Sequence, residues 1–213
     1  MRRTKEEAEQ TKQAILDAAV DVFTERGVAK SSLEEIAKAA NVTRGAVYWH
    51  FKNKIEIFDA LHERLHSPFI QRILEGLEAE HPNPIGQLQE LCTNILLELD
   101  QDEQVKKTLT LFLLKCDYTG DFEQSKASYN QKKLEKLEAF SRYFDLAIKK
   151  GTLPEDADPK LFTVAMNCFL RGVVVEYLDN PQEFNITTEA PRLMNFFFHN
   201  LRVVHNSPQS ANT

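Results

Sequence analysis

The sequence is poor in cysteine, and nothing in it pairs the few cysteines that are present. Its 213 residues contain three, Cys92, Cys116 and Cys168, which are far apart and form no paired motif. An odd number in a chain without a signal peptide is typical of reduced thiols, which predicts a cytoplasmic protein without a disulfide framework. All three lie in apolar helical patterns, where free cysteine usually packs as a small hydrophobic residue. A redox sensor is the less favoured alternative.

Long hydrophobic runs and strand patterns are also absent. The most apolar stretch, residues 161–178, is interrupted by Asn167, Arg171 and Glu176. It falls short of the about 20 apolar residues that a membrane-spanning helix needs, so we expect no membrane partner. No segment alternates apolar and polar residues strongly enough to predict a strand, and there is no internal repeat. These absences predict a soluble, all-α protein.

Net positive charge is lacking as well, since the chain carries a formal charge of −6. That total argues against a nucleic-acid partner, but the charge is unevenly distributed. Residues 1–54 hold 10 basic and 8 acidic residues, a net charge of +2, which leaves −8 for the remainder. A basic tip on an acidic body orients a molecule toward phosphate groups.

The most informative segment is residues 43–54, Thr-Arg-Gly-Ala-Val-Tyr-Trp-His-Phe-Lys-Asn-Lys. Val47 and Phe51 are four residues apart, so they share one helix face and can anchor it to a core. Arg44 and Tyr48 share a different face, which points outward. The major groove of DNA admits a helix, and arginine is well shaped to bind guanine. Two small residues would let the helix backbone approach the bases closely: Gly45 and Ala46.

A shorter helical pattern, residues 31–40, precedes this segment. Ser31 and Ser32 each stand three residues before a glutamate, so either can form a capping box. Asn41 lies where the turn needs a left-handed residue, and Thr43 is placed to cap the second helix. Two short helices joined by a three-residue turn predict a helix-turn-helix. The alternative, an ordinary helical hairpin, leaves the outward-facing basic and aromatic residues unexplained.

Residues 11–58 resemble the N-terminal domain of the TetR family, and residues 43–54 resemble its AcrR-like branch of multidrug-efflux repressors. The opening Arg-Arg-Thr-Lys-Glu-Glu-Ala and the helix ending Phe23…Arg26-Gly27-Val28 fit that branch as well. The resemblance implies a transcriptional repressor that binds double-stranded operator DNA and is released by a small-molecule inducer. It implies neither an enzyme nor a cofactor or metal.

Roles for individual side chains follow from their positions in the predicted DNA-binding unit. We expect Arg44 to read a base edge. Trp49 is expected to pack against a backbone sugar or to brace the helix. The residues expected to hold phosphates are Thr43, Tyr48, His50, Lys54 and Ser32. Two more basic residues could follow the backbone or enter the adjacent minor groove: Arg2 and Arg3.

The rest of the chain reads as helices separated by clusters of proline, glycine and aspartate. Residues 161–178 and 193–204 are apolar on nearly every side, which predicts burial against the core on one side and a second subunit on the other. The resemblance adds that the last two long helices form a four-helix bundle in a homodimer; a larger monomeric core is the alternative. The predicted domains are residues 1–55, which bind DNA, and residues 56–213, which bind ligand and dimerise.

The second domain is rich in phenylalanine: of 14 in the chain, only Phe23 and Phe51 precede residue 55. A cavity lined by aromatic rings suits flat, apolar, often cationic drugs. Composition alone favours a phenylalanine-rich core, and the resemblance favours a drug pocket. The residues predicted to line it are Phe112, Cys116, Met166, Phe169 and Leu170.

The helix predicted from Lys54 to about Glu80 carries two further features. Pro68 can kink it, which makes it a candidate hinge through which ligand binding changes the spacing of two recognition helices. His62-Glu63-Arg64-Leu65-His66 also matches the H-E-x-x-H signature of zinc peptidases, with both histidines expected at the edge of the apolar stripe. A convincing third ligand is missing. A zinc-dependent regulator or metallopeptidase is therefore the alternative function.

Overall fold

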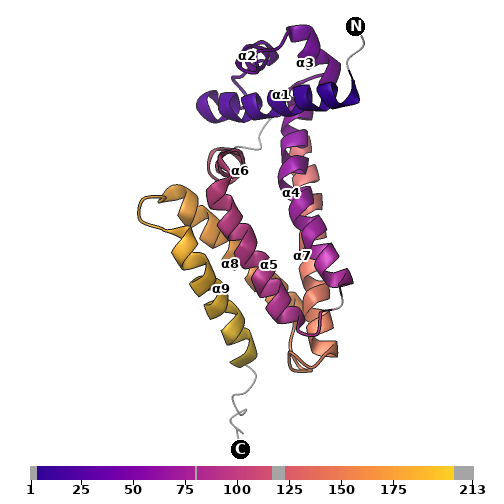
Figure 1. Cartoon of the computed structure of the whole chain (residues 1–213), viewed down its shortest axis with the longest axis vertical. Helices are drawn as coiled ribbons and strands as arrows, with labels where there is room; N and C mark the ends of the chain where they lie inside the picture. The colour runs from indigo at the N-terminus through magenta and orange to yellow at the C-terminus, as the bar shows by residue number, and fades with distance from the viewer. Residues whose placement is uncertain (1–3, 80, 117–122, 204–213) are drawn as a thin grey trace, which may run out of the picture. The chain divides into compact units, whose positions relative to one another are not determined.

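A computed structural model describes residues 4–79, 81–116 and 123–203, and within these ranges every regular element is helical (Figure 1). This confirms the all-α prediction. The elements are α1 (Lys5–Arg26), α2 (Leu33–Ala39), α3 (Arg44–His50), α4 (Lys54–Glu78), α5 (Pro84–Gln101), α6 (Glu103–Thr110), a π-helical turn (Leu111–Lys115), α7 (Glu123–Lys149), α8 (Pro159–Asp179) and α9 (Ile186–Val203).

Local chemistry explains where several helices begin and end. The Thr4 hydroxyl accepts a hydrogen bond from the Glu7 backbone N–H at 3.2 Å, and the Glu7 carboxylate accepts one from the Thr4 N–H at 2.8 Å. This capping box satisfies two backbone donors at the start of α1. Gly27 ends the same helix at φ +79°, a conformation that a side chain would strain. Asp102 and Asp158 cap α6 and α8 in the same way as Thr4 caps α1, by accepting from backbone N–H groups.

The chain divides into two compact units. The first comprises Met1–Ser67 and Asp102–Gln131, and the second comprises Pro68–Gln101 and Lys132–Thr213. Helix α4 contributes to both, and the division within it falls at Pro68, which lies inside the helix. The functional boundary between residues 55 and 56 stays a prediction.

The first unit is built around one face of α1. Its buried residues recur at helical spacing, so they line one side of the helix and meet apolar side chains from α2, α3 and α4. Burying one such side chain stabilises a fold by about 1.5–3 kcal/mol. The fully buried members of this core include Ile15, Ala19, Val20, Phe23, Ile36, Val47, Ile57, Phe58 and Leu61.

The second unit has a core formed by α5, α7, α8, α9 and the second half of α4. Phe140, Phe144 and Phe198 are fully buried in it, and the Tyr177 hydroxyl donates a hydrogen bond to Asp100 Oδ1 at 2.6 Å. Cys92 is buried there too, and burial raises the pKa of its thiol to about 12. No disulfide joins Cys92, Cys116 and Cys168.

Helix α8 departs from one expectation. By length and composition alone it is apolar enough to cross a membrane, so its interrupting polar residues do not exclude such a span as we expected. Part of its apolar surface is exposed in the single chain, and the predicted burial of that side by a second subunit stays a prediction. Leu161 and Val164 are more than half exposed on α8, as is Phe196 on α9.

Candidate nucleic-acid interface

Helices α1, α2 and α3 form a compact trio at the N-terminal end of the chain (Figure 1). Of the two serines that could cap α2, Ser32 does so: its hydroxyl accepts from the Glu35 N–H at 3.2 Å and donates to Glu35 Oε2 at 2.9 Å. The hydrogen bonds that the Glu35 carboxylate accepts from the Ser32 hydroxyl and from the Ser32 backbone N–H lower its pKa. Ser31 is buried instead and donates to the Val28 carbonyl at 2.8 Å. Because the Ser32 hydroxyl donates its only hydrogen to Glu35 Oε2, the predicted phosphate contact would require that hydrogen bond to break.

The turn between α2 and α3 has the predicted chemistry. Asn41 is at φ +53°, in the left-handed region that asparagine tolerates better than most residues. Thr43 caps α3, its hydroxyl accepting from the Ala46 N–H at 3.1 Å. Both predictions are confirmed. The turn therefore fixes the direction in which α3 leaves α2.

Helix α3 has seven residues and two distinct sides. Val47 is fully buried, and Phe51, which follows the helix, is 4% exposed, so these two side chains hold α3 to the core as predicted. On the outer side, Tyr48 is 44% and Trp49 is 71% exposed, and the Trp49 ring meets His50 edge-on at 4.4 Å. A Cβ atom added to Gly45 would have no neighbour closer than Thr43 Oγ1 at 3.9 Å, so this side is open to a close approach.

The Arg44 side chain is held by two neighbours. Its Nε lies 3.0 Å from Glu34 Oε1 on α2, and its Nη2 donates to the Tyr48 hydroxyl at 3.3 Å. The guanidinium carbon also lies 5.2 Å from the centre of the Tyr48 ring, within range of a cation–π interaction. The hydrogen bond to Tyr48 and the charge of Glu34 raise the pKa of Arg44.

Lys54 has a structural role that the sequence did not indicate. Its Nζ donates to the carbonyls of Val28 at 3.0 Å and Ala29 at 2.8 Å, so the start of α4 is fastened to the chain that follows α1. An ammonium group has three donors, which leaves one for the predicted phosphate contact. Nothing in the sequence near Lys54 points to these carbonyls, which are about 25 residues away. Arg2 and Arg3 lie outside the described residues.

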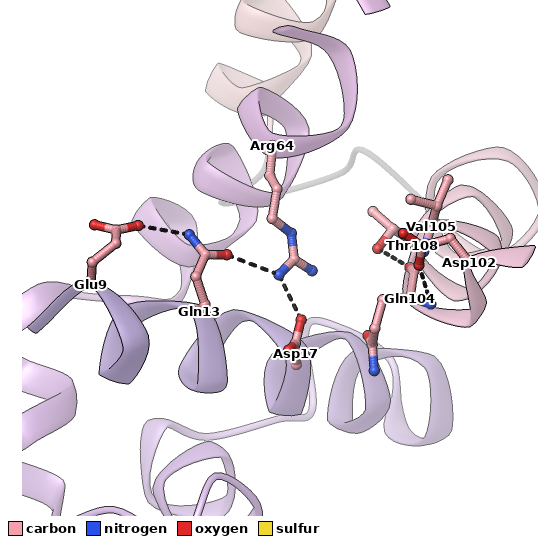
Figure 2. Close-up of polar contacts among 8 residues, drawn as sticks. All are labelled: Glu9, Gln13, Asp17, Arg64, Asp102, Gln104, Val105 and Thr108. Carbon is pink, nitrogen blue, oxygen red and sulfur yellow. Dashed lines mark hydrogen bonds and ion pairs between the residues drawn. The ribbon is translucent and has the colours of Figure 1, made fainter. Parts of the chain in front are cut away.

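Helices α4 and α6 are each bonded to α1 within the first unit. Arg64 of α4 donates through Nη1 to Asp17 Oδ1 at 2.6 Å and to Gln13 Oε1 at 3.4 Å, and Gln13 is itself bonded to Glu9 (Figure 2). Lys107 of α6 donates to Asp21 Oδ1 at 2.6 Å. A movement of α4 or α6 would therefore also displace α1, the helix that supports the helix-turn-helix.

The H-E-x-x-H sequence forms no metal site in the described part of the chain. His62 is 1% exposed, not at the edge of the stripe as expected, and its ring stacks on Phe112 with centroids 3.7 Å apart. Burial lowers the pKa of His62 to about 3, and the Glu63 carboxylate accepts a hydrogen bond from Ser67. Among the described residues no group of three or more histidine, cysteine or acidic side chains could hold a metal ion. The zinc alternative therefore has no support.

The five predicted pocket residues belong to two different units. Phe112 and Cys116 are in the first, where Phe112 also packs edge-on against Phe58 with centroids 5.1 Å apart. Met166, Phe169 and Leu170 are in the second, where Met166 is buried and Phe169 stacks on Phe197 at 4.9 Å. Their grouping into one pocket stays a prediction.

A capped turn that presents a short helix with an exposed arginine and exposed aromatic rings defines a helix-turn-helix DNA-binding protein. Comparison with known proteins agrees: residues 15–61 match the bacterial regulatory proteins of the tetR family, and residues 83–203 match the C-terminal region of MAATS-type transcriptional repressors. The chain belongs to the TetR family, in its AcrR-like branch. That family consists of transcriptional regulators and not of enzymes.

Relatives match along nearly the whole chain. The HTH-type transcriptional repressor BepR of Brucella suis is 32% identical, over 98% of this chain and 100% of its own length. The HTH-type transcriptional regulator AcrR of Shigella flexneri is 33% identical, over 89% of this chain and 88% of its own. The solved SmeT–triclosan complex is 29% identical, covers 96% of this chain and 98% of its own, and has a TM-score of 0.82. SmeT is the repressor of the Stenotrophomonas maltophilia multidrug efflux pump SmeDEF.

Proposed function

We propose that this protein represses a multidrug efflux operon and leaves its operator when a small aromatic or drug-like compound binds. The observation that carries the proposal is the exposed face of α3, in a chain of the AcrR-like branch whose relatives include an efflux-pump repressor. Because its target is chromosomal DNA, the protein works in the cytoplasm. The function needs no cofactor and no catalytic residue.

In this proposal α3 enters the major groove. Arg44 reads a guanine, and Gly45 and Ala46 let the helix backbone approach the bases. Side chains around Arg44 hold the flanking phosphates and fix the register of the protein on the duplex. These are Thr43, Tyr48, His50 and the remaining donor of Lys54, with Trp49 against a backbone sugar.

The active form is a homodimer through α8 and α9. Support comes from Leu161, Val164 and Phe196, large apolar side chains that are more than half exposed in the single chain. Exposed apolar residues on two neighbouring helices are typical of a subunit interface. A two-fold dimer would place its recognition helices about 34–36 Å apart, so that they read two half-sites one helical turn apart.

Induction is a shift between two conformations of the dimer. The ligand binds beside the predicted pocket residues of the second unit, Met166, Phe169 and Leu170, and α4 carries the change because it contributes to both units and is bonded to α1 through Arg64. A ligand moves such an equilibrium only by its differential affinity for the two forms, typically about 1–3 kcal/mol. Triclosan, which occupies the related SmeT, is the first compound to test.

The test begins by letting the wild-type protein select duplexes from a random pool and measuring binding by fluorescence anisotropy. The proposal expects one enriched palindromic sequence, bound tightly in the presence of excess random DNA. Triclosan and then a panel of drugs are added to the same complex, and at least one should lower the affinity. A pool that never becomes enriched would contradict the proposal.

A further inference from the structure

Glu34 is an unusual residue to find on the DNA-binding side of this protein. It occupies the first turn of α2 and is exposed, yet the cap of that helix uses Glu35 and not Glu34. Its carboxylate lies 3.0 Å from Arg44 Nε, so it accompanies the proposed base reader. A negative charge at that place repels the phosphates that the surface must approach. Its effect on Arg44 is the feature that could compensate for this repulsion.

A guanidinium has five N–H groups, and the contacts of Arg44 within the protein show which of them remain for DNA. The Glu34 carboxylate forms an ion pair with the guanidinium at Nε, and the Tyr48 hydroxyl accepts one hydrogen of Nη2. Both hydrogens of Nη1 and one of Nη2 are left. A guanine presents O6 and N7 to a bidentate arginine, and two terminal nitrogens are enough to meet that pair. The two protein contacts therefore leave the end of the guanidinium available to a base.

We infer that Glu34 is a positioning residue for base reading: it holds Arg44 by its Nε edge and leaves the terminal nitrogens for guanine. Tyr48 supports the same orientation from α3, through its hydroxyl and the face of its ring. The inference rests on the proposed function, since it assigns a partner to the residue that reads the operator.

Two consequences separate this role from that of an ordinary surface ion pair, which contributes little to stability. First, an arginine that is already oriented loses less side-chain freedom when it meets guanine. Second, the carboxylate partly neutralises Arg44, which makes it a poorer partner for phosphates of random sequence. Specificity is a difference between two affinities, and Glu34 acts on both.

The test uses the full-length protein and a duplex that the wild type has selected from a random pool. Binding is measured for this duplex, for one changed at the base pair assigned to Arg44, and for random DNA. The variants are Glu34→Ala, Glu34→Gln, Arg44→Ala and the double variant Glu34→Ala with Arg44→Ala. Glu25→Ala is the matched control, because it removes an acidic residue from α1 without touching Arg44. Thermal melting of each variant checks that it is folded.

We expect Glu34→Ala to weaken binding of the selected duplex about five- to tenfold, as for other coupled neighbours. Binding of random DNA should stay the same or tighten slightly. Glu34→Gln should lose about as much as Glu34→Ala, since the contact with Nε is an ion pair and the amide carries no charge. Glu34→Ala should have no effect when Arg44 is already alanine or when the Arg44 base pair is changed.

The opposite pattern would overturn the inference. If Glu34→Ala tightened binding to every duplex equally, and did so in the Arg44→Ala background too, Glu34 would be only a repelling charge. If the wild type enriched no sequence at all, the proposed function would fail and this inference would fall with it. Enrichment without coupling between Glu34 and Arg44 would remove the inference alone.

Discussion

Arg44 is the residue at which shape and charge can be separated by one substitution. Lysine keeps the positive charge but lacks the planar fork that binds guanine through two donors. Arg44→Lys should cost about 1–3 kcal/mol on the selected duplex and relax specificity at one base pair per half-site. The salt dependence of binding should stay nearly constant, because no phosphate contact is lost. Competition with duplexes changed at single positions measures the loss of affinity and the loss of specificity. Equal weakening on all sequences would instead assign Arg44 to a phosphate.

Lys54 and Lys52 form a natural pair of variants, since both are basic residues beside the recognition helix but only Lys54 binds the carbonyls of Val28 and Ala29. Lys54→Ala should weaken binding to all sequences and lower the salt slope. It should also lower the free energy of unfolding by about 1–3 kcal/mol, as expected for lost hydrogen bonds to a charged group. Lys52→Ala should leave stability unchanged. Denaturant unfolding measures the free energy of unfolding of both variants. Equal values for Lys54→Ala and Lys52→Ala would show that the carbonyl contacts contribute nothing to stability.

His62 gives the fold a dependence on pH. The pKa of its imidazole is lowered from 6.5 to about 3, so the folded chain keeps it neutral where the unfolded chain binds a proton. The stabilisation is present above pH 6.5 and declines as the pH falls toward 3, by roughly 2 kcal/mol at pH 5. His62→Leu should remove this part of the decline between pH 7 and pH 5. Parallel unfolding curves of wild type and variant at both pH values test it; an identical decline would place its origin elsewhere.

At the scale of helices, sequence predicted what local chemistry determines. Asn41 and Thr43 were identifiable because a turn conformation and a cap depend on the residue itself and its immediate neighbours. The carbonyl contacts of Lys54 and the burial of His62 were not predicted, because the partners of both side chains come from distant parts of the chain. The break between α5 and α6, with Asp102 as cap, was also missed. That stretch is polar but contains neither glycine nor proline, so it has no residue that typically marks the end of a helix.

Helix α4 offers a test of the conformational change at a residue that makes no proposed contact with DNA. It continues through Pro68, which supplies no backbone N–H, and the two compact units divide there. Pro68→Ala should restore the missing hydrogen bond and stiffen the helix. We expect inducer response to change more than operator affinity, as measured by titrating the operator complex with an active inducer. Equal loss of both would remove Pro68 as a hinge.

The whole molecule is expected to act as a pair. Replacing Leu161 and Phe196 with aspartate should separate the subunits, because each side chain is more than half exposed and would meet its counterpart across an apolar interface. Sedimentation should give a single species near 24.5 kDa for the variant and twice that mass for the wild type. The separated chains should bind a full palindrome no better than a half-site. A wild-type monomer at working concentration would contradict the dimer.

The brevity of α3 has a consequence for how such a regulator fails. Seven residues are too few to form a stable helix alone, so α3 exists only because Val47 and Phe51 are held by the core. Any substitution that destabilises that core therefore also unfolds α3 and removes its DNA-contacting side. In the proposed function, the positions at which a substitution can abolish repression are therefore far more numerous than the residues that contact DNA or drug. Loss of repression through mutation of this protein would then be expected from ordinary folding defects in the first unit as well as from changes at the contacts themselves.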